Sequence, residues 1–455
     1  MPSVGLIGSE FVPMAELTAK AFGIAGVPLA VYPGVIMADS DIDFHAKVAN
    51  AMVPAMFDAL LSDRAAAVDG SVEHIAAGEV VFTGDYDEVL EEFTRRGWTE
   101  GLPIVPPTRE RVDAFLACTD LAATTSLGNL RSSNTEATVL SVAVNGVMAG
   151  CRPEYMPILV AVVEALADRA FGVEDAGSTP GWEPLITISG PLVRQLGFNS
   201  GAGALRVGNR ANTSVGRFLR LYMRNVAGFR PYPDESDKGA ISYTFNVALA
   251  EDEEVTNELG WAPQRVDRGF GLEDTTVTLR SVSAISAPIY SSGERADDNL
   301  RVIARTAAEA LGGWAGYTYL NGGQFPLVIL GPAIARNIAA DGWTKDRVKQ
   351  YLYENLVIDA AWVQEYARGV SGRNFDWGLL ADDGRAPEEY RYAIEEKLMV
   401  RGTLGPDAFD IVVAGNPGRN QSRAYISNQI QGRPLTKAVK LPASWDEIRE
   451  RFSQP

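Results

Sequence analysis

The chain has 455 residues, of which 46% are apolar and 22% charged, the composition of a folded protein large enough for two or three domains. Its 41 basic and 58 acidic side chains give a formal net charge of −17, and such a surface repels nucleic-acid phosphates and anionic lipid. No apolar run approaches the roughly 20 residues of a membrane-spanning helix, and the amino terminus shows no export signal. We therefore expect a cytoplasmic protein with no nucleic-acid or membrane partner.

Cysteine and histidine are scarce: Cys118 and Cys151 are the only cysteines, and His45 and His74 are the only histidines. The two thiols are too far apart for a C-x-x-C pair, and a disulfide framework is implausible for a chain of this length. Four scattered residues also argue against a zinc site, whereas a site made of carboxylates would leave little trace in a sequence. We expect reduced thiols, assign no metal ligand and leave the cofactor unknown.

Residues 1–92 are expected to form a small α/β domain. Short apolar runs at 3–8 and 27–34 predict strands, and apolar positions at helical spacing in 14–22 and 44–61 predict helices. These elements are too few for a complete doubly wound domain.

Two further segments connect this part to the rest of the chain. An apolar stripe at helical spacing predicts a helix at 85–96. Residues 97–108 are rich in proline and are expected to be extended, and Thr108 is a suitable N-cap for the helix that follows.

Residues 93–290 and 291–455 are expected to form two related α/β modules. In each module a helix leads to an apolar strand, a Gly-Pro pair and a short helix that contains an arginine. The strands at 184–188 and 326–330 are offset by 142 residues (326 minus 184), and nearly the same offset relates the helices before them and the Gly-Pro pairs after them. We interpret this pattern as an internal duplication.

Further strands are predicted at 243–250, 275–282 and 409–414, from their β-branched and apolar residues. The fold class is therefore α/β. In such sheets ligands usually bind beyond the carboxyl ends of the strands.

The stretch AGCRPEYMP (149–157) holds the first candidate catalytic residues, Cys151, Arg152 and Glu154. Its prolines place the start of a regular helix near Pro157, so that Glu154 lies close to the positive end of the helix dipole. Cys151 lies about one turn upstream, beside an arginine, and both features favour a reactive thiolate. The alternative is a buried structural cysteine, which is also what we expect of Cys118.

Residues 197–217 form the second candidate segment, rich in glycine, asparagine and arginine. Glycines let backbone amides approach a ligand, and arginines bind carboxylate or phosphate. Asn212 or Thr213 is expected to cap the helix that follows, and an anion could bind at that helix end. The segment matches neither a dinucleotide-binding fingerprint nor a P-loop, and a purely structural loop is the alternative. The candidate substrate-binding residues are Asn199, Ser200, Arg206, Asn209, Arg210, Asn212 and Arg217.

The acidic run Glu251–Glu254 could supply a general base or hold a metal, and the alternative is a solvated face. His45 and His74 each follow carboxylates and are expected to be surface pairs rather than proton shuttles. The motifs of common serine hydrolases and zinc peptidases are absent.

These segments together resemble the UGSC-type (seleno)protein family, named for a selenocysteine-containing motif. The resemblance implies a redox or lyase-like enzyme whose amino-terminal part is related to thioredoxin. It extends from about residue 80 to the end of the chain. It is carried by GWTEGLPIVPPT (97–108), VNGVMAGCRPEYMP (144–157) and the shorter runs at 208–212, 216–217, 243–245, 268–270 and 340–343.

Two departures from the family pattern limit what the resemblance implies. The Sec/Cys-Gly-Ser-Cys motif is absent, and the amino-terminal segment is shortened where the motif should lie. Ala333 and Ile334 also stand where the family pattern places a Glu-His pair.

The first hypothesis is an oligomeric enzyme of small-molecule metabolism, an oxidoreductase or a lyase, that acts on a small anionic metabolite. A second hypothesis is a non-catalytic subunit of a hetero-oligomer, paired with a chain that carries the cysteine motif. Isolation from the native source would distinguish the two. A carboxylate-bound metal enzyme is a third hypothesis.

Overall fold

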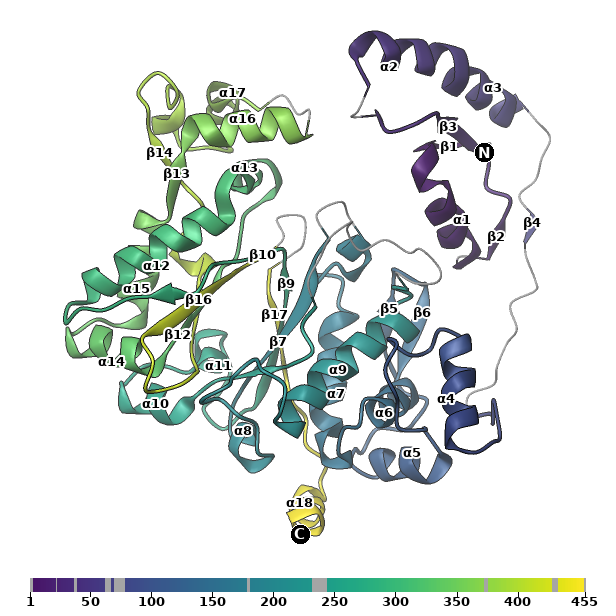
Figure 1. The fold of residues 1–455 in the computed structure, drawn as a ribbon, viewed down its shortest axis with the longest axis vertical. Coiled ribbons are helices and arrows are strands. Elements are labelled where there is room, and N and C mark those ends of the chain that lie inside the picture. The colour runs from purple at the N-terminus through teal and green to yellow at the C-terminus, as the bar shows by residue number, and fades with distance from the viewer. Residues whose placement is uncertain are drawn as a thin grey trace.

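The computed structural model describes residues 3–21, 23–36, 39–61, 67–68, 78–177, 181–230, 244–371, 375–427 and 433–453. Helices alternate with strands through most of the chain, and the strands form several small parallel, antiparallel and mixed sheets (Figure 1). The predicted α/β fold class is confirmed.

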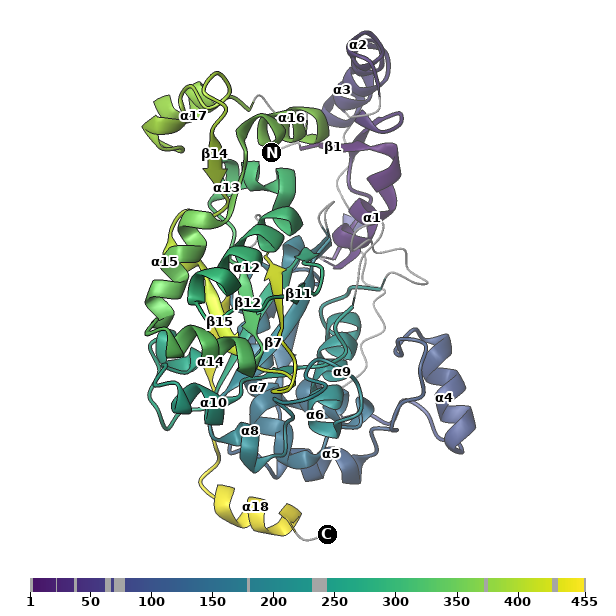
Figure 2. The same ribbon diagram turned by 60° about the vertical axis from the view of Figure 1, so that its left-hand side comes forward.

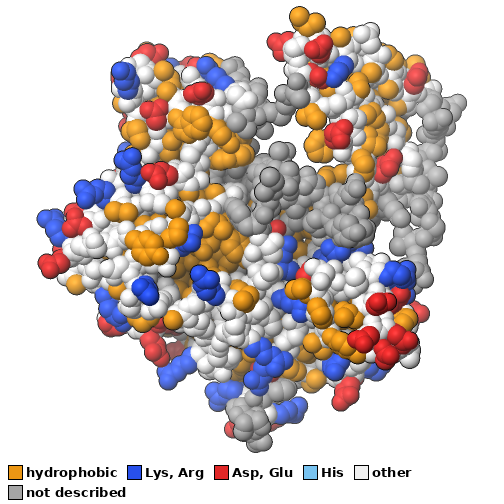
Figure 3. Space-filling view, in the orientation of Figure 1, with side chains coloured by type: hydrophobic (Ala, Val, Ile, Leu, Met, Phe, Trp, Pro, Cys, Tyr) orange, Lys and Arg blue, Asp and Glu red, His pale blue; other side chains and the backbone are white. Residues whose placement is uncertain are grey.

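The amino-terminal residues form a small unit of their own, seen at the upper right of Figures 1 and 2. Its predicted order of strand, helix, strand and helix is confirmed, and β1 pairs in parallel with β3. Apolar side chains lie on its surface at the upper right of Figure 3. Ile42 and Leu61 of this unit are 82% and 81% exposed. Its elements are β1 (Gly5–Gly8), α1 (Val12–Ala21), β2 (Ile24–Ala25), β3 (Leu29–Tyr32), α2 (Asp41–Lys47), α3 (Val53–Leu61) and β4 (Ala67–Val68).

The next part of the chain builds a sheet covered by helices. The predicted helix at 85–96, the helix that begins after Thr108 and the helix start near Pro157 are all present. Thr108 occupies the N-cap position, but its side chain makes no capping hydrogen bond to the helix backbone. Its elements are α4 (Tyr86–Arg95), α5 (Arg109–Leu116), β5 (Ser126–Leu130), β6 (Thr135–Thr138), α6 (Val139–Met148), α7 (Met156–Leu166), β7 (Glu183–Ser189), α8 (Leu192–Gln195), α9 (Arg210–Asn225), β8 (Leu249–Ala250), α10 (Glu253–Glu258), α11 (Gln264–Asp267) and β9 (Thr276–Val282).

The last part of the chain builds a second sheet of this kind. The predicted strands at 326–330 and 409–414 lie at its centre and edge, as β12 and β15. Its elements are β10 (Ala284–Ile285), β11 (Ile289–Tyr290), α12 (Ala296–Leu311), α13 (Gly316–Asn321), β12 (Leu327–Leu330), α14 (Pro332–Ala340), α15 (Lys345–Asn355), β13 (Val357–Asp359), α16 (Ala360–Ser371), α17 (Trp377–Asp382), β14 (Met399–Arg401), β15 (Asp410–Val413), β16 (Gln421–Ile426), β17 (Leu435–Ala438) and α18 (Trp445–Ser453).

Four strands of each sheet have the same order and the same directions, and the second sheet has one further strand, β11, which also pairs with β16. In the first sheet, β7 lies between β8, which is parallel to it, and β9, which is antiparallel, and β17 lies outside β9. In the second sheet, β12 lies between the parallel β15 and the antiparallel β16, and β10 lies outside β16. This likeness agrees with an internal duplication, which itself stays a prediction.

Each sheet takes its outer strand from the other predicted module, since β10 belongs to 93–290 and β17 to 291–455. After β9 the chain crosses to the second sheet as β10, and after β16 it crosses back to the first sheet as β17. Neither sheet is therefore built from one predicted module alone, although the boundary at residue 290 stays a prediction. The crossing also means that the two sheets cannot separate without losing strand pairs.

The sheets pack against each other in the middle of the molecule, and helices cover their outer faces. In Figure 1, α6, α7 and α9 cover the first sheet on the right, and α12, α14 and α15 cover the second sheet on the left. Every residue of α7 except Glu164 is buried, as expected for a helix inside a large core. A third apolar cluster, which includes Leu185, Leu327 and Tyr425, lies between the sheets.

A glycine follows the central strand of each sheet, at the start of the Gly-Pro pair. A Cβ at Gly190 would lie 2.4 Å from the Cα of Thr275, and a Cβ at Gly331 would lie 2.5 Å from the carbonyl oxygen of Gln421. In both sheets the neighbouring antiparallel strand leaves no room for a side chain. The Gly-Pro pattern in the sequence thus reflects a packing requirement that the two halves share.

Two sequence predictions need correction. Most of the predicted strand at 243–250 is not a strand: only Leu249–Ala250 pairs, and Tyr243 lies outside the described residues. The preceding residues pack on α9 instead, where Ala248 donates its N–H to the carbonyl of Asn212. The cap of α9 is Asn209, upstream of the predicted Asn212 or Thr213.

Within the described part of the chain, no helix is both long enough and apolar enough to cross a membrane.

A buried carboxylate joins the two sheets. Asp410, at the start of β15 in the second sheet, accepts hydrogen bonds from Arg280 of β9 in the first sheet and from Arg268. Asp410 is 5% exposed and Arg280 is 1% exposed. Burial alone would raise the pKa of Asp410, but the two guanidinium groups outweigh it and hold this pKa below its ordinary value.

Replacing Asp410 by Asn should therefore lower the free energy of unfolding by about 3–5 kcal/mol, because it leaves Arg280 charged and uncompensated between the sheets. Urea denaturation measures this change. The control is Asp297→Asn, whose exposed ion pair with Arg295 is 3.5 Å long and whose loss should cost less than about 1 kcal/mol. Equal stability of the two variants would show that the Asp410 pairs do not hold the sheets together.

Candidate functional site

The candidate segments 149–157 and 197–217 and the motif segment 97–108 meet along one face of α9. Arg210 donates from Nε and Nη2 to the carbonyl of Gly150, at 3.3 and 3.2 Å. Arg217 pairs with Glu100 and donates to the carbonyl of Pro103 at 2.7 Å. Arg224 donates to the carbonyl of Gly97 at 2.6 Å. Residues seven apart share one helix face, so one stripe of arginines binds both motif segments, 97–103 and 149–157.

Cys151 lies near Arg210 and Arg217, but its side chain is buried. Its side chain is 5% exposed, and burial raises the pKa of the thiol to about 12, although the nearby Ser214, Arg210 and Arg217 lower it. Cys118 is 1% exposed, and burial raises its pKa to about 11. Neither cysteine is in a disulfide. Both are therefore uncharged thiols at neutral pH, which favours a structural role for Cys151 over a nucleophilic one.

Glu154 is the more reactive candidate in the same stretch. It lies in the short 3-10 turn Pro153–Tyr155 that leads into α7, where the prolines of the sequence place it. Glu154 is 4% exposed, and its Oε1 lies 2.5 Å from Nε of Arg152. Its Oε2 is buried and has no hydrogen-bond partner among the residues that the structure describes. Burial raises its pKa above the ordinary value, although its own backbone N–H, Arg152 and Arg210 lower it.

Three arginines, Arg152, Arg210 and Arg217, lie beside two carboxylates, Glu100 and Glu154. The side chain of Arg152 is 38% exposed and Arg210 lies at the surface. We call these five residues the Glu154 cluster.

The loop before α9 is built by its own asparagines. The Oδ1 of Asn212 accepts the N–H of Asn199 at 2.7 Å, and its Nδ2 donates to the carbonyls of Asn199 and Ala248. The Oδ1 of Asn209 caps α9 by accepting the N–H of Asn212. Asn212 therefore has no hydrogen-bonding group left for a ligand, and Asn209 occupies the helix end where we expected an anion.

Two other predicted binding residues lie farther along this loop. The carbonyl of Ser200 accepts the N–H of Gly415 at 2.8 Å, so the glycine loop after β15 meets the loop before α9. Arg206 is exposed on the outer side of the loop. The structure thus brings Cys151, Arg152, Glu154, Arg210 and Arg217 together, and uses the asparagines as scaffold.

Glu100, which pairs with Arg217, is a site residue that was not predicted from the sequence. The seven-residue spacing of Arg210, Arg217 and Arg224 was a usable signal, because such a stripe on a helix face needs acceptors nearby.

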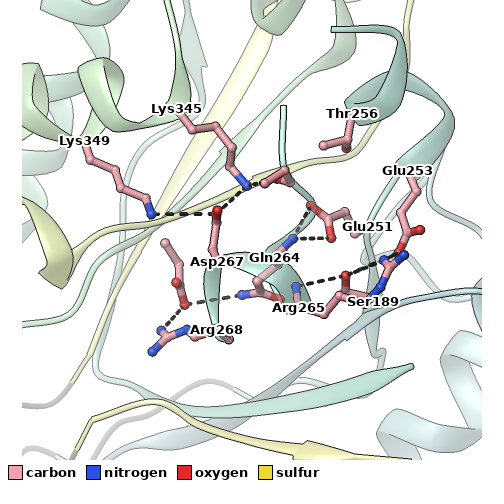
Figure 4. A network of polar contacts seen from close by, with 12 residues as sticks. Ser189, Glu251, Glu253, Thr256, Gln264, Arg265, Asp267, Arg268, Lys345 and Lys349 are labelled. Atoms are coloured by element: carbon pink, nitrogen blue, oxygen red, sulfur yellow. Dashed lines mark hydrogen bonds and ion pairs between the residues drawn. The ribbon is translucent and has the colours of Figure 1, made fainter. Parts of the chain in front are cut away.

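The acidic run divides into a buried and an exposed part. Glu251 is 1% exposed and accepts the backbone N–H of Gln264 with both oxygens, at 3.1 and 2.9 Å (Figure 4). Glu253 pairs with Arg265, whereas Glu254 is exposed. The solvated-face interpretation therefore fits Glu254 only. Glu251 continues the first sheet beyond β8, since its N–H donates to the carbonyl of Ile188.

Lys345, from the second half of the chain, completes the buried network of polar contacts around Glu251. Nζ of Lys345, on α15, lies 2.6 Å from Asp267 and donates to the carbonyl of Ala262 at 2.7 Å (Figure 4). Burial raises the pKa of Glu251 to about 7, although Lys345, Ser189 and Gln264 lower it. The network joins the halves of the molecule and contains a group that titrates near neutral pH.

Among the described residues, no group of three or more His, Cys, Asp and Glu side chains is arranged to hold a metal ion. His45 is exposed on α2, and His74 lies outside the described residues.

No family model, no curated protein and no solved structure matches the chain. The similarity to the UGSC-type family therefore stays a resemblance of motifs.

The Glu251 network makes stability depend on pH. Because its pKa is raised, the folded protein binds a proton at Glu251 more tightly than the unfolded chain does. This contribution to stability is complete below the ordinary value of 4.5 and is lost as the pH rises through about 7. The side chain at position 251 does not titrate in E251Q, so this variant does not lose stability as the pH rises. Its free energy of unfolding relative to that of the wild type should therefore rise by up to about 3 kcal/mol between about pH 5 and about pH 8.5.

Urea denaturation across this pH range measures the difference, and the control is E254Q. The Glu254 side chain is 82% exposed, 3.4 Å from Arg194, so E254Q should follow the wild type at every pH. A constant difference between E251Q and the wild type would contradict the raised pKa.

Proposed function

We propose that the chain is an enzyme that acts on a small anionic metabolite at the Glu154 cluster. The observation that carries this proposal is the pairing of a buried, proton-binding carboxyl group with arginines that reach the surface. Arg152 and Arg210 bind the anionic group of the substrate, because guanidinium groups bind carboxylate and phosphate with two parallel hydrogen bonds. Glu154 lies beside them as acid or base.

The proposed chemistry is proton transfer, as in a lyase. A carboxyl group whose pKa is raised holds its proton more tightly, and Glu154 can exchange that proton with a substrate bound by the arginines. Dithiol redox chemistry is less well supported, since burial keeps Cys118 and Cys151 as thiols. In this proposal Cys151 and Ser214 form the inner wall of the site. The loop before α9, which is held by hydrogen bonds of its asparagine side chains, positions Arg210.

Anion binding tests the proposal without knowledge of the reaction. Titration calorimetry with inorganic phosphate and with malonate should detect saturable binding to the wild type. Arg210→Ala should weaken binding at least about 10-fold, because it removes one charged hydrogen-bonding group from the clamp. Glu154→Gln should bind as tightly as the wild type or more tightly, because it removes a negative charge and keeps the shape.

The matched control is Arg305→Ala, which removes an exposed arginine of α12 paired only with Glu309 at 3.4 Å among the described ion pairs. It should bind both anions like the wild type. Equal weakening in R210A and R305A would indicate general charge screening, and equal binding by the wild type and R210A would exclude Arg210 as the clamp.

A further inference from the structure

A pocket of about 820 Å³ lies between the extended segment 78–84 and the helices α4, α5 and α6, apart from the Glu154 cluster. Three aromatic side chains and two prolines line it, together with aliphatic side chains of all three helices. These residues are Phe82, Phe93, Trp98, Pro106, Pro107, Val89, Val112, Leu116, Leu140, Val144 and Met148.

The aromatic part of the wall is well ordered by its own contacts. The rings of Phe93 and Trp98 meet edge to face, with centroids 5.1 Å apart and planes at 83°. The guanidinium of Arg96 lies 4.8 Å from the centroid of the Trp98 ring. The prolines beyond Trp98 add flat, rigid surface. Such a wall suits the face of another ring.

The polar groups of the pocket fall into three sets, of which one is the exposed threonines Thr83, Thr108 and Thr124. Asn145 and Asn225 lie on the helices, and Nδ2 of Asn225 donates to Oδ1 of Asn145 at 2.9 Å. The charged lining residues, Glu79, Arg109 and Asp113, are all exposed. An apolar interior with a few amide groups and with charges only at the rim selects an uncharged ligand.

One face of α6 lines the pocket. Val139 and Val142 are fully buried, whereas Leu140 and Val144, four residues apart on the helix, are only partly buried and line the pocket. A helix this apolar normally buries every side in protein.

We infer that this pocket binds a neutral, flat aromatic molecule of drug-like size. The volume lies within the range of about 300–1,000 Å³ typical of small-molecule sites. None of Cys151, Arg152, Glu154 and Arg210 lines the pocket, so this site is independent of the proposed anion site and adds a second ligand class. Trp98, Val144 and Asn145 belong to the motif segments 97–108 and 144–157, and this site gives those residues a function.

The probe for the test is Nile red, a neutral, flat dye whose fluorescence rises in apolar surroundings. It should bind the full-length protein saturably, with one site per chain. Val144→Phe fills the pocket and should weaken binding at least about 10-fold. The matched control is Val302→Phe, at a 36% exposed position of α12, and it should bind like the wild type.

Leu140→Phe repeats the test from a second position should V144F fail to fold, which circular dichroism would reveal. An excess of phosphate should not displace the dye, so that failure of this site and failure of the Glu154 cluster give different results. The inference is overturned if the wild type shows no saturable binding, or if a folded pocket-filling variant binds like V302F.

Discussion

One carboxylate fixes how the two halves of this protein meet. Asp410 lies between the sheets and is bound by Arg268 and Arg280, so charges that would be costly to bury alone are buried together. The exchanged strands β10 and β17 also hold the two sheets together, because each pairs with a strand of the other half of the chain. The glycine loop after β15 contacts the loop before α9, since Gly415 donates its N–H to the carbonyl of Ser200, and the second sheet therefore supports the loop that leads to Arg210.

The proposed site depends on the fixed backbone of the loop before α9. Asparagine amides fix the backbone before α9, and the helix then presents arginines seven residues apart to the two motif segments. Glu154 is held at the start of α7 by the local rules for proline and the first helical turn. A buried acid beside surface arginines is a costly arrangement, and costly arrangements of titratable groups concentrate at functional sites.

Helix starts and strand ends that depend on neighbouring residues could be predicted from the sequence, whereas contacts between residues far apart in the chain could not. The prolines around Glu154 located the start of α7, and the Gly-Pro pairs located the ends of β7 and β12. The strand predicted at 243–250 was wrong over most of its length because Ala248 hydrogen bonds to Asn212 of α9 rather than to a neighbouring strand. Burial of Glu251 was missed because an acidic run is normally solvated, and only the pairing of its backbone with Ile188 places it inside. The exchanged strands had no local signal, since pairing between residues far apart is decided by the whole fold.

The ionisation of Glu154 tests the central claim most directly. NMR of isotope-labelled side-chain carboxyl carbons, with E154Q to assign the signal, follows this one group through a pH titration. The account predicts that the pKa of Glu154 lies above 4.5 in the free protein and rises further when phosphate binds beside it. An ordinary pKa that phosphate leaves unchanged would contradict both the proton-binding role of Glu154 and the position of the anion.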